Sequence, residues 1–239
     1  MTCQRTRPGW LALVLTVVSA APLAAQTPHE QHHPGQSAPD PKTQGGLGHM
    51  DHRFDDPERY AKEFDDPGRD AWQMPERVIE ALALKTGAKV ADIGAGTGYF
   101  SMRLAAAPAK PTVFAVDLEP AMVAHLAKRA AAEKRVNVVA VQAAADSPNL
   151  PEAMDVVLVV DTYHHIPNRP AYFAGVREKL RPGGRLAIID FRKGGPGGPP
   201  DDFRFTTDQI SGELAQAGFV LDQSLDFLSR QLFLIYRVK

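Results

Sequence analysis

Beyond residue 75, two kinds of segment follow one another in turn: short apolar runs rich in Val, Ile and Ala, and amphipathic stretches. A strand with one solvent-exposed face would alternate apolar and polar residues, whereas these runs are almost entirely apolar. They therefore indicate strands buried on both faces of a parallel sheet. The stretches between them have helical periodicity. Expected strands begin at Lys89, Thr112, Val136, Met154 and Gly184, and expected helices cover 76–84, 99–107, 121–133 and 171–180.

The end of the chain has a different pattern. One more expected helix, TTDQISGELAQAGF, is closed by Gly218, and two apolar runs follow with only a short turn around Ser229 and Arg230. So short a turn joins only antiparallel neighbours. We therefore predict an α/β fold: a Rossmann-like, doubly wound, mostly parallel seven-stranded sheet with a C-terminal antiparallel hairpin. Ligands of such sheets bind outside the carboxyl ends of the strands.

The first 25 residues have the pattern of a secretory signal peptide. Arg5 and Arg7 precede an apolar run, and small residues follow up to Ala25, where cleavage is expected. The run is shorter than the ~20 residues of a spanning helix, so no stable membrane span is expected; an uncleaved N-terminal anchor is the alternative. Either reading predicts a domain outside the cytoplasm, periplasmic or secreted. The one cysteine, Cys3, lies in this leader.

Residues 26–52 form a linker rich in His, Pro and Gln, with too few branched aliphatic residues to fold, and we expect it to be disordered. Its histidines could meet at a transition metal, but no specific metal site is predicted. The domain is expected at 53–239. It opens with a helical preface or lid at 53–75, where FDDPERY and FDDPGRD each place an Asp cap before a Pro, and Phe64 and Trp72 serve as anchors.

Composition and charge narrow the class of protein. The chain is 44% hydrophobic and 23% charged, as in an ordinary globular protein, and its formal net charge is -1. It has no run of interleaved basic and aromatic residues. Nucleic acid is therefore not an expected partner. The sequence carries no signal for the oligomeric state.

The segment ADIGAGTGYF is the strongest chemical signal. Asp92 ends an expected strand, and Gly94, Gly96 and Gly98 lead into a helix. Glycines let the backbone turn tightly and approach a ligand. A dinucleotide fingerprint would need its third glycine where Tyr99 stands, which disfavours an NAD-dependent oxidoreductase. A turn that merely needs glycines is the alternative.

The spacing DxGxGxG resembles the S-adenosylmethionine motif of class I methyltransferases, in particular small-molecule enzymes of the type 11 and 25 kind, and the resemblance extends over 54–239. It implies that the loop, with Ala95, cradles the methionine portion and that Asp92 serves the amino group. Asp117, in VFAVDLEP, would accept hydrogen bonds from the ribose hydroxyls beside Leu118. The alternative for Asp117 is a helix cap.

Two further segments bear on the resemblance. The family's adenine-binding acid would align with Ala144, so Asp146, two residues later, would have to replace it. The fourth strand ends in VDTYHHIPN, similar to the segment at the methyl-transfer centre, and by position Asp161, Tyr163 and His164 would face the mouth of the site. Either histidine of the pair could instead pack or cap the neighbouring helix.

These features predict an S-adenosylmethionine-dependent methyltransferase. Its acceptor would be an unidentified small molecule, methylated by in-line displacement, for which the protein holds the two reactants together and excludes water. A general base is needed only if the nucleophile must lose a proton. The alternative is a non-catalytic protein of the same fold that binds S-adenosylmethionine or a nucleoside.

Overall fold

The structure is a computed structural model that describes residues 56–239. The expected signal peptide at 1–25, the linker at 26–52 and the first three residues of the expected domain lie outside the described residues. Among the described residues, no helix is both long and apolar enough to cross a membrane.

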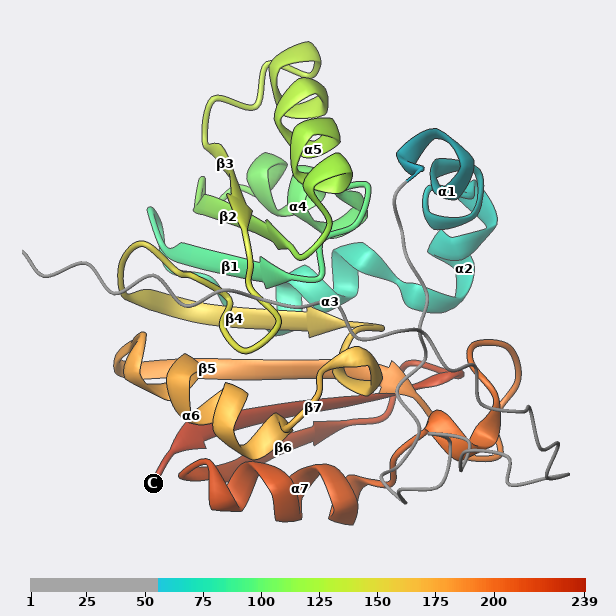
Figure 1. Cartoon of the computed structure of the whole chain (residues 1–239), viewed down its shortest axis with the longest axis vertical. Coiled ribbons are helices and arrows are strands. Elements are labelled where there is room, and N and C mark those ends of the chain that lie inside the picture. The colour runs from blue at the N-terminus through green and yellow to red at the C-terminus, as the bar shows by residue number, and fades with distance from the viewer. Residues whose placement is uncertain (1–55) are drawn as a thin grey trace, which may run out of the picture. The chain divides into compact units, whose positions relative to one another are not determined.

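One seven-stranded sheet organises the described residues, in the order β3-β2-β1-β4-β5-β7-β6 (Figure 1). Strands β1 to β5 run parallel, whereas β7 pairs antiparallel with both β5 and β6. This confirms the expected mostly parallel sheet with an antiparallel C-terminal hairpin. The strands are β1 Lys89–Ile93, β2 Thr112–Asp117, β3 Val138–Gln142, β4 Met154–Val160, β5 Leu180–Phe191, β6 Phe219–Leu225 and β7 Gln231–Val238.

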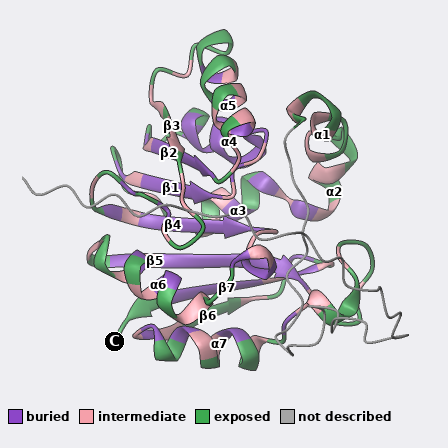
Figure 2. Cartoon of the chain, viewed as in Figure 1, coloured by how far each residue is buried: buried purple, intermediate pink, exposed green. Residues whose placement is uncertain are grey.

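Helices cover both faces of the sheet because successive strand residues point to opposite sides. On one face, Val157 and Val159 of β4 belong to a core cluster with α6 and α7. On the other face, Leu158 belongs to a cluster with α3 and α4. The central strands are buried along most of their length (Figure 2). The α-helices are α1 Pro57–Phe64, α2 Asp70–Gln73, α3 Pro75–Ala81, α4 Tyr99–Ala106, α5 Pro120–Ala132, α6 Arg169–Glu178 and α7 Thr207–Gln216.

The helices shift by one to three residues from expectation, and the starts of two strands also differ. The third strand begins at Val138 rather than Val136, whose side chain is 97% exposed and contributes nothing to a core. The fifth strand begins at Leu180 rather than Gly184, because Leu180 already pairs with Met154 before the register shifts. Residues 182–184, between the expected helix and the expected strand, thus lie in an irregular part of β5, and α6 ends before them at Glu178.

The expected helical preface is present and is built as its repeated sequence predicts. Asp56 caps α1 by accepting the Arg59 amide at 3.1 Å, and Pro57 occupies its first turn. Asp66 likewise accepts the Gly68 amide at 2.8 Å at the start of the 3-10 helix η1, Pro67–Arg69. We call residues 57–73 the preface. Figure 1 shows α1 and α2 at the end of the sheet to which the arrowheads of β1 and β4 point.

Candidate functional site at the carboxyl ends of the strands

The glycine loop connects β1 to α4, and its glycines have positive φ angles of 74°, 55° and 94° at Gly94, Gly96 and Gly98. The loop is tied to β2, because the amides of Gly94 and Ala95 both donate to the carbonyl of Val116. A Cβ atom on Gly94 would lie 2.1 Å from the hydroxyl oxygen of Thr162. Glycine is therefore required where this loop meets the loop after β4.

Asp92 lies beneath the glycine loop with 2% of its surface exposed. Its carboxylate accepts a hydrogen bond of 2.6 Å from the hydroxyl of Ser101 in α4. Burial raises the pKa of Asp92 to about 6, and the Ser101 hydroxyl and the Arg69 guanidinium oppose that rise. A carboxylate removed from water in this way favours a cationic group of a ligand as its neighbour.

Asp117 ends β2 and fixes the other side of the loop. It accepts the amides of Gly96 at 2.8 Å and Glu119 at 3.0 Å. It is not the N-cap of α5, a position held by Glu119, and burial raises its pKa. Since each carboxylate oxygen has two lone pairs, both can still accept a ligand hydroxyl. Leu118 follows with 51% of its surface exposed, an apolar surface beside a polar group.

Asp146 is exposed in the loop after β3, next to the isolated bridge between Ala144 and Ser147. Its contact with an adenine ring stays a prediction.

A second polar group lies at the end of β4. Asp161 has a positive φ of 52°, which costs free energy in a non-glycine residue and therefore points to a local role. Its carboxylate accepts hydrogen bonds from Arg69 at 3.4 Å, Gln73 at 3.3 Å and Gln231 at 2.5 Å. Burial raises the pKa of Asp161 to about 6, against the opposing charge of Arg69. We call Asp161, Arg69, Gln73 and Gln231 the Asp161 cluster.

His164 and Asp190 form a buried pair beside this cluster. Asp190, near the end of β5, accepts the Nδ1 of His164 at 2.9 Å and also its backbone amide at 3.2 Å. Because a carboxylate can only accept, Nδ1 carries the hydrogen and Nε2 keeps its lone pair in the neutral ring. The ring of His165 stacks at a tilt with its centroid 4.2 Å from that of His164.

Tyr163 does not face the mouth of the site, and that expectation is wrong. Its side chain is fully buried in the core and stacks on Phe173 at 5.5 Å between ring centroids. Its hydroxyl donates to the carboxylate of Glu213, which also binds Arg169, and burial raises the pKa of the phenol. Asp161 has an αL backbone conformation, and Tyr163, two residues later, packs in the core cluster with residues of α6 and α7.

Four residues of the site were not expected from the sequence: Arg69, Gln73, Asp190 and Gln231. Two of them could have been found. Asp190 is next to last in the fifth strand, where the rule that sites lie at the carboxyl ends of strands applies, and Gln231 starts a strand antiparallel to it, which brings it to the same edge. Arg69 and Gln73 carry no such signal, because only packing of the preface brings them there.

The chemistry of this edge fits S-adenosylmethionine. The set is rich in acceptors, with the carboxylates of Asp92, Asp117 and Asp161, and the Oε1 of Gln231 is buried without a hydrogen-bond donor among the described residues. The ligand offers an ammonium group, a sulfonium centre and two ribose hydroxyls. Within the described part of the chain, no three His, Cys, Asp or Glu residues are arranged to hold a metal ion.

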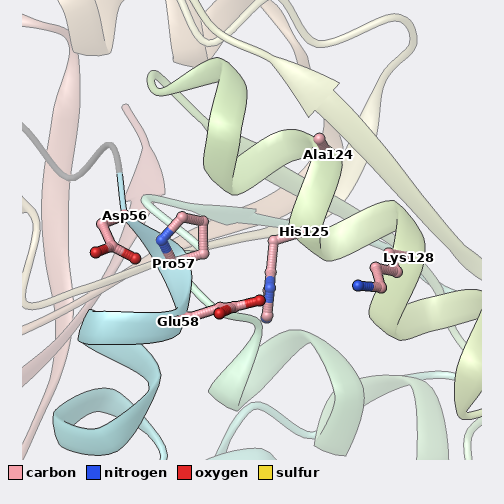
Figure 3. Close-up of a pocket in the computed structure, with 6 residues that line it drawn as sticks. All are labelled: Asp56, Pro57, Glu58, Ala124, His125 and Lys128. Carbon is pink, nitrogen blue, oxygen red and sulfur yellow. The ribbon is translucent and has the colours of Figure 1, made fainter.

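A separate surface pocket of about 340 Å³ lies between α1 and α5 (Figure 3). Asp56, Pro57, Glu58, Ala124, His125 and Lys128 line it. Because none of these residues follows a strand or belongs to the glycine loop, this pocket is distinct from the site at the strand ends.

Comparison with protein families gives a match to a methyltransferase domain over residues 91–186. Among curated proteins, 27-O-demethylrifamycin SV methyltransferase of Amycolatopsis mediterranei (strain S699) is 33% identical over 122 residues, which cover 50% of this chain and 44% of that protein. Arsenite methyltransferase of Halobacterium salinarum is 32% identical over 143 residues, covering 59% and 36%. The matched segments span 26% to 50% of the length of these and the other curated relatives.

Solved structures show the same fold. An S-adenosylmethionine-dependent methyltransferase from Aquifex aeolicus superimposes with a TM-score of 0.70 at 23% identity, covering 77% of this chain and 99% of that one. The glycopeptide N-methyltransferase MtfA in complex with S-adenosylmethionine gives 0.56 at 18% identity, covering 69% and 87%. Residues 91–186 therefore match a methyltransferase domain, and the described residues have the fold of these S-adenosylmethionine-dependent methyltransferases.

Proposed function

We propose that the chain transfers a methyl group from S-adenosylmethionine to a small-molecule acceptor by in-line displacement. One observation carries the proposal: two buried strand-end carboxylates, Asp92 and Asp117, flank the loop DxGxGxG, and Asp117 is hydrogen-bonded to that loop. Such an edge supplies acceptors for a cationic amino acid at one end and for ribose hydroxyls at the other. The methyltransferase match over residues 91–186 supports the same assignment.

In this proposal the backbone of Gly94, Ala95, Gly96 and Gly98 cradles the methionine portion. Asp92 accepts its ammonium group, and Asp117 accepts the ribose hydroxyls.

Leu118 and Asp146 complete the cofactor site in the proposal. The exposed Leu118 side chain offers apolar contact to the adenine ring. Asp146 serves the adenine amino group.

The residues after β4 are proposed to act on the acceptor. S-adenosylmethionine supplies a methyl group on a sulfonium, a reagent that already carries the driving force, so the chain mainly positions the acceptor and excludes water. His164 is held by Asp190 through Nδ1, which leaves Nε2 as the acceptor of the neutral ring, and in the proposal it accepts the proton that an O–H or N–H nucleophile releases. Asp161 orients the acceptor. Tyr163 has no catalytic part, since the core encloses it.

A small acceptor is supported by the names of the relatives. They include methyltransferases of a rifamycin, of erythromycin, of phosphoethanolamine and of arsenite. Each of these names states what that relative acts on, and the acceptors differ in chemistry. We therefore propose only the class of acceptor, a small molecule, for this chain.

The test is calorimetric titration of the full chain with S-adenosylmethionine and S-adenosylhomocysteine, beside Asp117→Asn. We expect micromolar binding that falls at least about tenfold in the variant, because a charged acceptor of two hydroxyl donors is lost. Glu178→Gln, an exposed carboxylate in the last turn of α6, serves as the matched control and should bind as the parent does. A folded chain that binds neither ligand would refute the proposal.

Catalysis is tested separately by following label from methyl-labelled S-adenosylmethionine into small-molecule extracts. Binding with no transfer to any extract favours the non-catalytic alternative. If the parent chain transfers methyl groups and His164→Ala does not, while both bind the cofactor with the same affinity, the result supports His164 as the base.

We further propose that the chain is exported through its first 25 residues. The basic residues followed by a short apolar run and Ala25 support this. Export would place the enzyme where S-adenosylmethionine must be supplied from the cytoplasm, and an uncleaved anchor remains the alternative.

A further inference from the structure

We propose that Arg69, which the preface contributes, binds the carboxylate of the methionine portion of S-adenosylmethionine. The inference deepens the proposed function and rests on it: the preface is part of the cofactor site rather than only a cover. Neither the glycine motif nor the strand ends contain this residue.

The charge of the site requires such a group. The residues that the motif and the fold place around the cofactor are acidic: Asp92, Asp117 and Asp161. The amino-acid portion of the cofactor carries an ammonium group and a carboxylate. Asp92 serves the first, but a carboxylate brought close to this group of carboxylates is strongly unfavourable unless a cation accompanies it.

Arg69 has the geometry to be that cation. Its Nε donates to the Oε1 of Gln73 at 2.5 Å, one Nη donates to the carbonyl of Phe64 at 2.8 Å, and the other lies 3.4 Å from Asp161. A guanidinium has five N–H donors, so these contacts leave one on each Nη for a ligand carboxylate. The side chain is 14% exposed, so it is held in place yet open to a ligand.

The guanidinium is fixed at the glycine loop by its surroundings. It lies over the ring of Tyr99, the residue after Gly98, at 4.1 Å from the ring centroid. Phe64, whose carbonyl accepts from Arg69, packs against the loop, because a Cβ atom on Gly96 would come within 3.3 Å of its ring. The same charge opposes the rise in pKa of both Asp92 and Asp161 and so favours their ionised forms.

The test compares two ligands that differ in the amino-acid portion. S-adenosylhomocysteine has the carboxylate and the ammonium group, and 5′-methylthioadenosine has neither. In calorimetric titrations of the full chain, Arg69→Ala should weaken S-adenosylhomocysteine about 10- to 100-fold, the size of one or two charge-assisted hydrogen bonds, and leave 5′-methylthioadenosine unchanged. Arg69→Lys should recover part of the loss, since it keeps the charge without the fork.

Arg103→Ala is the matched control. Arg103 lies over the same Tyr99 ring, at 3.9 Å, and binds Asp70 of the preface at 2.9 Å, so its removal loosens the preface while Arg69 stays. S-adenosylhomocysteine should bind this variant far better than it binds Arg69→Ala.

Three results would overturn the inference. In the first, Arg69→Ala leaves the affinity for S-adenosylhomocysteine unchanged. In the second, it weakens both ligands equally, which would indicate loss of a cover. In the third, Arg103→Ala has the same selective effect. If the parent chain binds neither ligand, the proposed function itself fails, which is a different outcome from binding that is insensitive to Arg69.

Discussion

Several single residues at the strand ends lower the stability of the fold and are proposed to serve ligand binding. Gly94 is needed for a close approach between two loops, and Asp92 and Asp161 are carboxylates held in surroundings that disfavour their charge. Each of these features lowers the free energy of unfolding relative to an apolar or unstrained alternative. Such costs are typical of functional sites.

Replacing Gly94 with alanine tests the close approach. At Gly94 the Cβ atom would meet the Thr162 side chain at 2.1 Å, whereas at Gly87, which has a similar φ of 70°, nothing lies within 4 Å. We expect Gly87→Ala to lower the free energy of unfolding by about 1 kcal/mol through strain alone, and Gly94→Ala by about 2–4 kcal/mol because overpacking is added. Urea unfolding of both variants measures the difference. Equal losses would mean that Thr162 moves aside without cost.

The pKa of Asp92 predicts a pH dependence of stability. It is about 6 in the folded chain, above the ordinary value of 3.8, so the folded state binds the proton more tightly than the unfolded state does. The contribution to stability is therefore full below pH 4 and is lost as the pH rises through 6, about 3 kcal/mol in all. In urea unfolding between pH 4 and 8, stability should decline less in Asp92→Asn than in the parent, by about 3 kcal/mol, because only Asp161 and Asp117 still contribute to the decline. Parallel curves for parent and variant would contradict the assignment.

At the scale of elements, the preface is joined to the domain by polar contacts, several of them around the Tyr99 ring, and by the aromatic contact of Trp72 with Phe191. Asp70 accepts the Tyr99 hydroxyl at 2.5 Å and Arg103 at 2.9 Å, and Asp65 binds Arg129 of α5 at 2.9 Å. No side chain of α1 is buried. Segments with little buried apolar surface open at low free-energy cost. The preface should therefore exchange amide hydrogens faster than the sheet does.

The attachment of the preface can be tested through Asp70. Asp70→Ala removes the acceptor that Tyr99 and Arg103 share, so amide exchange across 57–73 should accelerate about tenfold or more, if the contacts contribute on the order of 1.5–3 kcal/mol. Mass-resolved hydrogen exchange measures this, with the exposed Glu178→Ala as control. S-adenosylhomocysteine should restore protection, since Arg69 is proposed to bind it. Unchanged exchange would show that apolar packing, not Asp70, holds the preface.

Features of this architecture that depend on neighbouring residues in the sequence could be predicted, and features that depend on contacts between distant residues could not. The strands and helices of the sheet follow from periodicity, and β4 begins and ends where its apolar run does. The glycine loop and Asp117 follow from local sequence chemistry. The Asp161 cluster does not, because Arg69 and Gln231 are 92 and 70 residues from Asp161 and meet it only through packing. Tyr163 was misplaced because the αL turn at Asp161 redirects the chain.

At the scale of the whole molecule, the expected export signal precedes a domain that is proposed to use S-adenosylmethionine, a cofactor made in the cytoplasm. We predict that protein recovered from the periplasm or the medium begins at Gln26, which N-terminal sequencing of the purified chain determines. A chain that keeps its first 25 residues and sediments with membranes would indicate the uncleaved anchor instead.

The Asp161 cluster draws its members from the preface, from the loop after β4 and from the first residue of the last strand. A ribosome synthesises these parts in that order, and the half-buried carboxylate of Asp161 has its full set of partners only after β7 has emerged and paired between β5 and β6. The Asp161 cluster is therefore complete only once β7 has been synthesised and has paired with β5. Any machinery that must engage the open chain can do so until that point.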